Sequence, residues 1–190
     1  MTTNVLLVGV GGQGILLAAR IIARAAETAG FEVTTHEIHG MAQRGGSVSA
    51  QVRYGGKLFS PLMAEGSADV LGALEPVEAL RFSHWLKPEG FAAVSVHPVI
   101  PVTVSTGRAA YPENFRELLA GRFARLKLVD CERLAVEHFK DIRLANTILL
   151  GALSNGLELP QDAWNQAIAA CVKPAFAAAN RSAFEEGRKL

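Results

Sequence analysis

Short apolar runs alternate with stretches of helical periodicity over the first two thirds of the chain. Residues 4–8 are rich in Val and Leu and end at a glycine, which predicts a buried strand. Residues 14–29 place apolar side chains at helical spacing, and Gly30 is a typical helix stop. Residues 31–36 alternate β-branched residues and predict a second strand. This order predicts a βαβ unit, in which the two strands form a parallel pair with a right-handed crossover.

The segment after the second strand indicates an antiparallel element. Residues 47–54 alternate between apolar and polar positions, and Gly55-Gly56 favours a turn. Leu58-Phe59 then begins a short return strand. Together these features predict a hairpin, so we expect part of the sheet to be antiparallel.

The remaining pattern continues the alternation and then becomes helical. Further strands are predicted at 69–74, 90–96 and 126–130, with a short edge strand at 103–106. Helices are predicted at 76–86, 112–120, 132–139, 144–154, 161–171 and 174–186. The fold class is therefore α/β: a three-layer, Rossmann-like sandwich with a mostly parallel sheet, an antiparallel hairpin and a C-terminal helical layer over about 142–190. Since the 190 residues show no repeat or linker, we expect one domain spanning 1–190.

Composition narrows the classes of function. The net charge is +1 and the basic residues are scattered, so no nucleic-acid partner is expected. The chain has no run of about 18 apolar residues and no basic leader, which predicts a cytoplasmic protein without a membrane span. Cys131 and Cys171 lie far apart and make no metal or iron–sulfur spacing, and such low cysteine use is typical of a reducing compartment. A charged fraction of 19% is low and agrees with a surface partly covered by a partner.

A glycine-rich loop connects the first predicted strand to the first helix and matches the pattern G-x-G-x-x-G. Gly9 allows a tight turn, Gly11 lets an anionic group approach the backbone, and Gly14 lets the helix pack closely against the strand. The helix N-terminus adds free N–H groups and a partial positive charge. The predicted binding residues of this loop are Gly9, Gly11, Gly12, Gln13 and Gly14.

Two interpretations of the glycine loop stay open beside binding of an anionic ligand. A stand-alone dinucleotide-binding module or dehydrogenase needs an acidic residue at the end of the second strand to bind the ribose, and Glu37 is the candidate. Alternatively, the glycines only build a tight turn that faces a partner chain.

A second loop, His39 to Ser47, follows the second strand and is expected at the same carboxyl edge of the sheet. Arg44 is able to grip a carboxylate or phosphate with two hydrogen bonds, and Met41 offers an adaptable apolar contact. The loop is either an anion-binding or partner-docking edge, or a flexible turn before the hairpin. Its candidate binding residues are Gly40, Met41, Gln43, Arg44, Gly45, Gly46 and Ser47.

Catalytic chemistry within this chain is not indicated. His36 and His39 form a possible ligand pair, but no third ligand lies nearby in sequence, so no metal site is predicted. Ser47 lacks the G-x-S-x-G pattern of a nucleophile, and Cys131 is expected to be a buried structural cysteine. We therefore predict no catalytic residue.

Several motifs in this order resemble one family. The two loops are followed by Ala68-Asp-Val-Leu71, by Leu74-Glu-Pro-Val-Glu-Ala-Leu80 and by Ala145-Asn-Thr-Ile-Leu-Leu-Gly151. This set resembles the gamma-type subunits of 2-oxoacid:ferredoxin oxidoreductases over nearly the whole chain. Within that family it is most similar to the indolepyruvate ferredoxin oxidoreductase beta subunits. The resemblance implies one gamma-type catalytic domain over residues 1–190.

The resemblance also implies a borrowed chemistry. Such an enzyme decarboxylates a 2-oxoacid, here indolepyruvate or another aryl pyruvate, passes electrons to ferredoxin or another acceptor, and transfers the acyl group to coenzyme A. Thiamine diphosphate, Mg²⁺ and iron–sulfur clusters are expected on a large alpha-type subunit, because this chain has neither a G-D-G…N motif nor a cysteine cluster. The chain is then an oxidoreductase subunit of a hetero-oligomer, inactive alone. It either docks as a non-catalytic scaffold or contacts coenzyme A at the interface, since the diphosphate suits a helix N-terminus.

Overall fold

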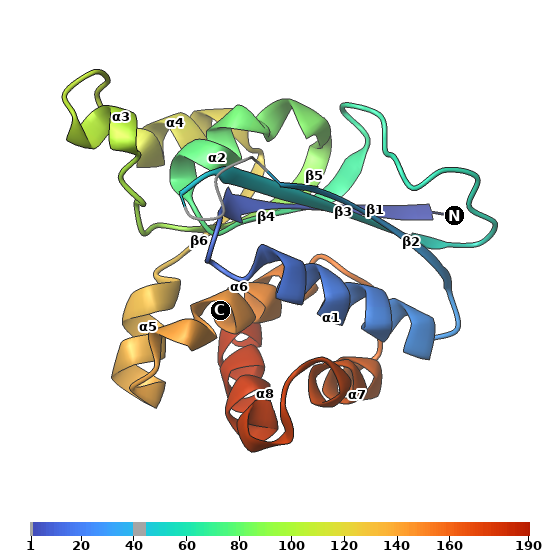
Figure 1. Ribbon diagram of the computed structural model, residues 1–190. Helices are drawn as coiled ribbons and strands as arrows, with labels where there is room; N and C mark the ends of the chain where they lie inside the picture. The colour runs from blue at the N-terminus through green and yellow to red at the C-terminus, as the bar shows by residue number, and fades with distance from the viewer. Residues whose placement is uncertain (1, 40–44) are drawn as a thin grey trace.

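A six-stranded mixed sheet lies between two layers of helices (Figure 1). The computed structural model describes residues 2–39 and 45–190. The strands are β1 (Thr2–Val10), β2 (Glu32–His39), β3 (Ser47–Gly55), β4 (Ala68–Ala73), β5 (Leu86–Ser95) and β6 (Arg125–Val129), in the order β2-β3-β1-β4-β5-β6. The pairs β1–β4, β4–β5 and β5–β6 are parallel, whereas β3 is antiparallel to both of its neighbours. The predicted α/β class is confirmed.

The predicted parallel pair of the first two strands is wrong, because β3 lies between them. Val52 of β3 pairs with Val5 of β1 on one side and with Thr35 of β2 on the other. Both outer strands therefore run in the same direction without touching. The hairpin is formed by β2 and β3, joined through the second loop, and not by residues 47–54 and 58–59.

The predicted return strand at Leu58-Phe59 does not form. The segment that contains it leaves the sheet and folds over one face. Met63 is buried against Leu6 and Val8 of β1, and its backbone N–H donates to Gln51 Oε1 at 2.9 Å. The segment covers the sheet instead of extending its edge, because both edges of β3 are already paired.

Helices cover the two faces unequally. Below the sheet in Figure 1 lie five helices: α1 (Ile15–Thr28), α5 (Cys131–Phe139), α6 (Ala145–Ser154), α7 (Gln161–Cys171) and α8 (Pro174–Arg188). Above it lie α2 (Pro76–Arg81), α3 (Val102–Ser105) and α4 (Phe115–Arg122). Two 3₁₀ turns, Ser83–Trp85 and Ile142–Leu144, complete the described elements. The three predicted C-terminal helices agree closely with α6, α7 and α8.

Two predictions in the upper layer are wrong. The predicted edge strand at 103–106 is helix α3, whose first turn closes when the N–H groups of Val104 and Ser105 donate to Pro101 O, each at 3.0 Å. The β-branched residues there indicated a strand, but β6 already occupies the edge of β5. The helix predicted over 76–86 ends at Arg81, and β5 begins at Leu86, earlier than expected.

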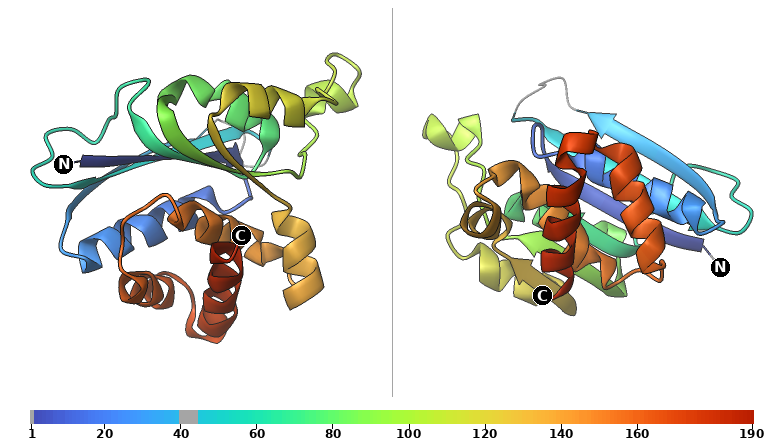
Figure 2. Two further views of the ribbon diagram at one scale, coloured as in Figure 1. Left: turned by 180° about the vertical axis from the view of Figure 1, so that it is seen from behind. Right: turned by 90° about the horizontal axis from the view of Figure 1, so that it is seen from below.

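A close crossing of α6 and α8 holds the lower layer together. All residues of α6 are buried, and Figure 2 shows this helix between the sheet and α8. A Cβ added at Gly151 would lie 2.1 Å from Phe184 O, and one at Gly187 would lie 1.9 Å from Ile148 O. These two glycines let the helix backbones touch, because any side chain there would separate them.

Substituting Gly151→Ala should therefore destabilise the chain by about 1–3 kcal/mol, the usual effect of overpacking a filled site. The measurement is the midpoint of urea unfolding. Gly121→Ala in α4 is the matched control, since an added Cβ there meets nothing within 4 Å. It should stabilise the helix by up to about 1 kcal/mol. An unchanged midpoint for Gly151→Ala would contradict the close crossing.

Candidate functional site

The carboxyl ends of four parallel strands meet at one edge of the sheet. After β1 the chain turns to α1 below the sheet, and after β4 it turns to α2 above it (Figure 1). β1 and β4 are neighbours, so the chain direction divides between them. In α/β sheets ligands bind in the crevice at such a switch point. The glycine loop borders this crevice, as the sequence predicted.

The glycines of the first loop serve different purposes. Gly12 and Gly14 have positive φ angles of 103° and 84°, which only glycine adopts freely. A Cβ at Gly9 would lie 2.8 Å from Ile15 Cδ1, whereas one at Gly12 would meet nothing within 4 Å. The backbone of Gly12 is therefore open to a ligand.

The role predicted for Gly14 needs a correction. We expected it to let α1 pack against the strand, but its close neighbour is Asn146 at the start of α6. A Cβ at Gly14 would lie 2.3 Å from Asn146 Nδ2, and that amide donates to Gly14 O at 3.4 Å. Gly14 thus allows α1 and α6 to begin side by side.

The Gln13 side chain fills the crevice between β1 and β4. Its Oε1 accepts from Val10 N at 2.8 Å, and its Nε2 donates to Leu74 O at 2.8 Å. Both ends of the amide are used within the protein. Gln13, predicted as a binding residue, therefore fixes the glycine loop to the end of β4.

The second loop ends beside the glycine loop. Gly46 O accepts from Gly11 N at 2.8 Å, and Ser47 pairs with Val10 in the β1–β3 register. The predicted proximity of the two loops is confirmed for the described residues Gly45, Gly46 and Ser47. The other candidates of this loop, namely Gly40, Met41, Gln43 and Arg44, lie outside the described residues.

A cleft of about 390 Å³ opens below the glycine loop. The helices α1, α5 and α6 all begin at it, and neither α1 nor α6 has a side-chain cap at its N-terminus. The uncapped start of α1 leaves backbone N–H groups available to an anion. In contrast, α6 continues from the 3₁₀ turn Ile142–Leu144, and Ala145 N donates to Ile142 O. The lining residues are Gly12, Gln13, Gly14, Leu74, Glu132, Ile142, Arg143, Ala145 and Asn146.

Two charged side chains, Arg143 and Glu132, line this cleft. Arg143 is 73% exposed and makes paired hydrogen bonds with Asp141, the shortest at 2.7 Å, which lower the pKa of that carboxyl group. Glu132 Oε2 lies 2.5 Å from His97 Nδ1 at the neighbouring strand end. Neither Arg143 nor Glu132 was expected at a site from the sequence, because both residues reach the cleft only through the packing of α5 and α6.

A smaller cleft of about 140 Å³ lies above the sheet and contains two buried carboxylates, Glu75 and Glu78. Glu75 accepts from Glu78 N at 2.9 Å and from the Tyr111 hydroxyl at 2.6 Å. Glu78 accepts from the Ser47 hydroxyl and forms an ion pair with Arg81 at 3.2 Å. The network ties the second loop and the segment around Tyr111 to α2. Both glutamates belong to the motif at 74–80, which the sequence analysis related to a helix at 76–86 and to the family resemblance, but not to a buried network.

Burial shifts the pKa values of this network. It raises the pKa of Glu78 above its ordinary value of 4.5, although the Ser47 hydroxyl and Arg81 act in the opposite direction. The pKa of Tyr111 is raised first by burial and then by its hydrogen bond to Glu75.

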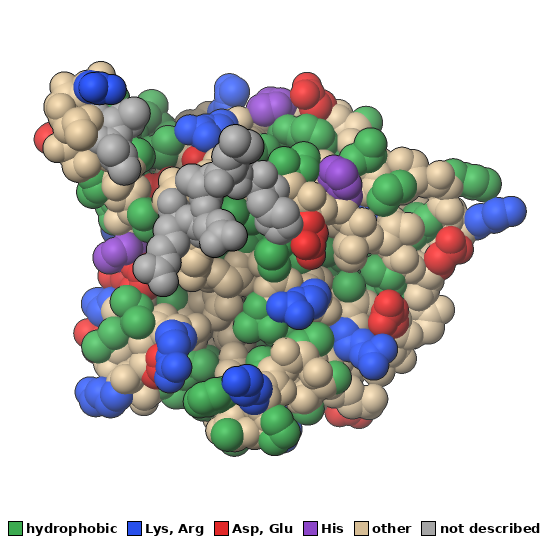
Figure 3. Space-filling view, viewed as in Figure 1, with side chains coloured by type: hydrophobic (Ala, Val, Ile, Leu, Met, Phe, Trp, Pro, Cys, Tyr) green, Lys and Arg blue, Asp and Glu red, His purple; other side chains and the backbone are tan. Residues whose placement is uncertain are grey.

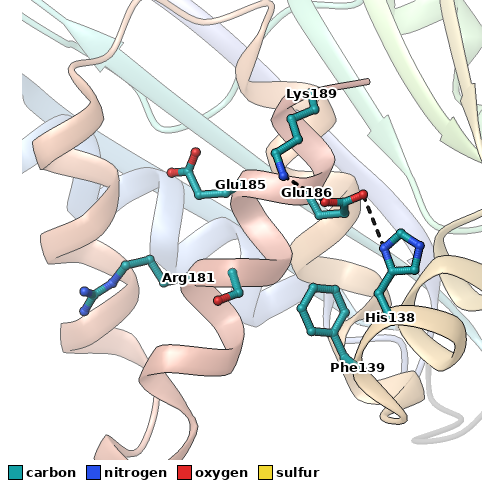
Figure 4. A pocket seen from close by; sticks show the side chains of 7 residues that line it. His138, Phe139, Arg181, Glu185, Glu186 and Lys189 are labelled. Atoms are coloured by element: carbon teal, nitrogen blue, oxygen red, sulfur yellow. Dashed lines mark hydrogen bonds and ion pairs between the residues drawn. The ribbon is translucent and has the colours of Figure 1, made fainter.

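Two further clefts lie in the lower layer. One, of about 460 Å³, separates α5 from α8, and Figure 4 shows His138 and Lys189 both pointing toward Glu186. The His138 Nδ1 to Glu186 Oε1 distance is 3.3 Å, so the imidazole and the carboxyl group meet across the two helices. The other, of about 310 Å³, is lined by Leu17, Leu144, Val172 and Phe176, among others.

The positions of Glu37 and Cys131 bear on two expectations from the sequence, a dinucleotide site and a structural cysteine. Glu37 lies on β2, which is separated from β1 by the whole of β3, or about 10 Å. A ribose held at the glycine loop is thus far from the predicted acid. Cys131 is buried as expected, and burial raises the pKa of its thiol to about 12, so it is a structural residue.

Residues 2–39 and 45–190 contain neither a metal-binding cluster nor a membrane-spanning helix. Within these ranges no group of three or more His, Cys, Asp or Glu side chains is placed to hold a metal ion. No helix in the described part of the chain has the length and apolar character needed to cross a membrane.

Comparisons with known proteins give one consistent result. The family model described as pyruvate ferredoxin/flavodoxin oxidoreductase matches residues 4–190. Indolepyruvate oxidoreductase subunit IorB of Thermococcus kodakarensis is 40% identical over 191 residues, which cover 98% of this chain and 94% of the relative. The pyruvate/ketoisovalerate oxidoreductases common subunit gamma of Pyrococcus furiosus is 30% identical, covering 80% of this chain and 76% of its own length.

Solved structures agree with the sequence relatives. The keto/oxoacid ferredoxin oxidoreductase gamma subunit of Geobacter sulfurreducens aligns with a TM-score of 0.71 at 25% identity, covering 98% of this chain and 96% of that one. The 2-oxoglutarate:ferredoxin oxidoreductase of Magnetococcus marinus shares the fold, with a TM-score of 0.73 at 21% identity. It covers 99% of this chain but only 30% of that longer one.

Replacing Glu78→Gln should change how stability depends on pH. Burial raises the pKa of Glu78 in the folded chain above its pKa in the unfolded chain. The contribution of Glu78 to the free energy of unfolding is therefore full below the unfolded-state pKa and is lost as pH rises through the folded-state pKa. Gln does not titrate, so the unfolding free energy of the variant should increase relative to that of the wild type as pH rises above the ordinary glutamate value of 4.5. Urea unfolding over a series of pH values measures the difference. Glu89→Gln, at an exposed position, is the control; a pH-independent difference for Glu78→Gln would contradict the buried carboxylate.

Proposed function

The chain belongs to the pyruvate ferredoxin/flavodoxin oxidoreductase family and is an oxidoreductase subunit, and we propose that it serves a 2-oxoacid:ferredoxin oxidoreductase acting on indolepyruvate or another aryl pyruvate. The observation that carries this proposal is the similarity to IorB, which extends over 98% of this chain and 94% of that relative. The adjacent glycine and second loops at the switch point support it, because both motifs fall inside the matched region.

We assign the redox and thiamine chemistry to a large alpha-type subunit. An iron–sulfur cluster takes four cysteine thiolates, whereas this chain has two cysteines, of which Cys131 is buried. Thiamine diphosphate, when bound on the partner, supplies the decarboxylation. Low cysteine use supports a reducing cytoplasm as the location of the proposed complex.

The contribution of this chain is binding, and coenzyme A is the ligand that suits its cleft. The diphosphate of coenzyme A would meet the open backbone of Gly12, the uncapped start of α1 and the guanidinium of Arg143. The rival role is a scaffold that holds the large subunit without touching a ligand. A dehydrogenase with its own nicotinamide cofactor is disfavoured, because β3 separates Glu37 from the glycine loop.

Reconstitution tests the proposed function. Neither this chain nor the large subunit alone should reduce a dye with indolepyruvate and coenzyme A, whereas the purified mixture should do so. We expect this result because the proposed electron path lies on the large subunit, whereas the proposed coenzyme A site lies partly on this chain. Full activity from the large subunit alone, or failure of the two chains to co-purify, would exclude the subunit role.

The glycine loop distinguishes ligand binding from a scaffold role. Gly12→Val should raise the KM for coenzyme A at least tenfold while leaving the complex intact. Gly30→Val is the matched control, because both glycines have positive φ and open space at the Cβ position. Both variants should lose about 1–2 kcal/mol of stability from the backbone alone. Equal KM values in the two variants would favour the scaffold.

A further inference from the structure

An apolar loop, residues 57–62, projects from the end of the sheet farthest from the glycine loop. It follows β3, whose last residue Gly55 pairs with Thr2 at the start of β1. Phe59 is 86% exposed and Leu62 is 52% exposed. Figure 1 shows this loop at the right-hand end of the sheet, and Figure 3 shows the same end as a narrow projection. Large apolar side chains on such a tip are typical of an interaction site.

Hydrogen bonds from the half-buried Arg53 hold the backbone of the apolar loop. Arg53 Nη1 donates to Ser60 O at 2.6 Å and to Leu62 O at 2.8 Å, while its Nε donates to Asn4 Oδ1 at 2.9 Å. Leu62 N donates to Ser60 Oγ at 3.1 Å. The loop is therefore shaped in advance, and little conformational entropy is lost when a partner binds it.

Met63, the residue that follows the apolar loop, fixes the orientation of the exposed side chains. Met63 is 5% exposed and packs beside Leu6 and Val8, and its N–H donates to Gln51 Oε1. With Met63 turned into the core, Leu62 points to solvent together with Phe59. Lys57 Nζ lies 5.4 Å from the Phe59 ring centroid and adds a positive charge to the tip. The tip is thus convex, apolar and basic at its rim.

A convex tip requires a concave partner. None of the four clefts described above is lined by a residue of the apolar loop. A two-fold contact between copies would set one convex tip against another, which buries little surface. In the Magnetococcus marinus enzyme the same fold occupies 30% of a longer chain, so other parts of that enzyme accompany it. These observations favour a different, larger chain over a second copy.

We propose that the apolar loop inserts Phe59 and Leu62 into an apolar pocket of the large subunit, with a carboxylate of that subunit near Lys57. This inference rests on the proposed function, because it takes the large subunit as the partner. The loop and the glycine loop lie at opposite ends of β1, about 30 Å apart for nine residues. Loss of the anchor should therefore weaken assembly and leave the coenzyme A site unchanged.

The test measures the affinity of the full-length chain for the tagged large subunit. Phe59→Ser should raise the Kd at least tenfold, equivalent to about 1.4 kcal/mol, and Phe59→Ser with Leu62→Ser should raise it further. Phe176→Ser on α8 is the matched control, since Phe176 is 44% exposed and lies in the lower helical layer. At saturating large subunit, the KM for coenzyme A should equal that of the wild type. Thermal unfolding should be unchanged, because Phe59 makes few contacts in the free chain.

The outcomes separate this inference from the proposed function. If the wild-type chain does not bind the large subunit, the subunit role itself fails. If the wild type binds and Phe59→Ser binds within twofold of it, only the docking role of the apolar loop fails. An equal loss for Phe59→Ser and Phe176→Ser would also overturn it, because the effect would then not be specific to the loop.

Discussion

The antiparallel insertion of β3 between β1 and β2 decides the rest of the architecture. Its backbone pairs with β1 from Thr2 to Val10 on one side and with β2 from Glu32 to His39 on the other. The insertion starts β3 at the end of β1, so the second loop finishes beside the glycine loop. It also moves β2 one strand away from the position it would hold in a dinucleotide-binding sheet. The same strand carries Gln51 and Arg53, which brace the segment that follows it.

The polar side chains at the carboxyl edge are largely engaged with the protein itself. Gln13 joins the ends of β1 and β4, while Glu75 and Glu78 join α2 to Tyr111 and Ser47. Such satisfied networks make the edge rigid, because each lost hydrogen bond would leave a buried group unpaired. For the proposed ligand this leaves the backbone at Gly12, the start of α1 and the guanidinium of Arg143. The open backbone at Gly12 agrees with the coenzyme A site proposed above.

The sequence predicted local structure better than contacts between distant segments. Periodicity placed α1 and the three C-terminal helices, because each buries one face or, in α6, its whole surface. It could not give the order of the strands, since the choice between β2 and β3 as the neighbour of β1 depends on residues about fifty positions apart. The proximity of Asn146 to Gly14 spans 132 positions and was missed for the same reason. Glu75 and Glu78 stood in a recognised motif, but glutamate is rarely buried, so their place in the interior was not expected.

The order in which the helices are synthesised determines how long the apolar face of α1 stays uncovered. α1 is synthesised before the other helices of this fold, yet its apolar face belongs to a core cluster with residues of α6 and α7, such as Ile148 and Ile168. On the ribosome that face stays uncovered until about residue 171 has emerged. The upper face of the sheet closes earlier, because α2 and α4 precede residue 123. The nascent chain therefore passes through a half-covered state, in which the lower face is the one open to chaperones or to aggregation.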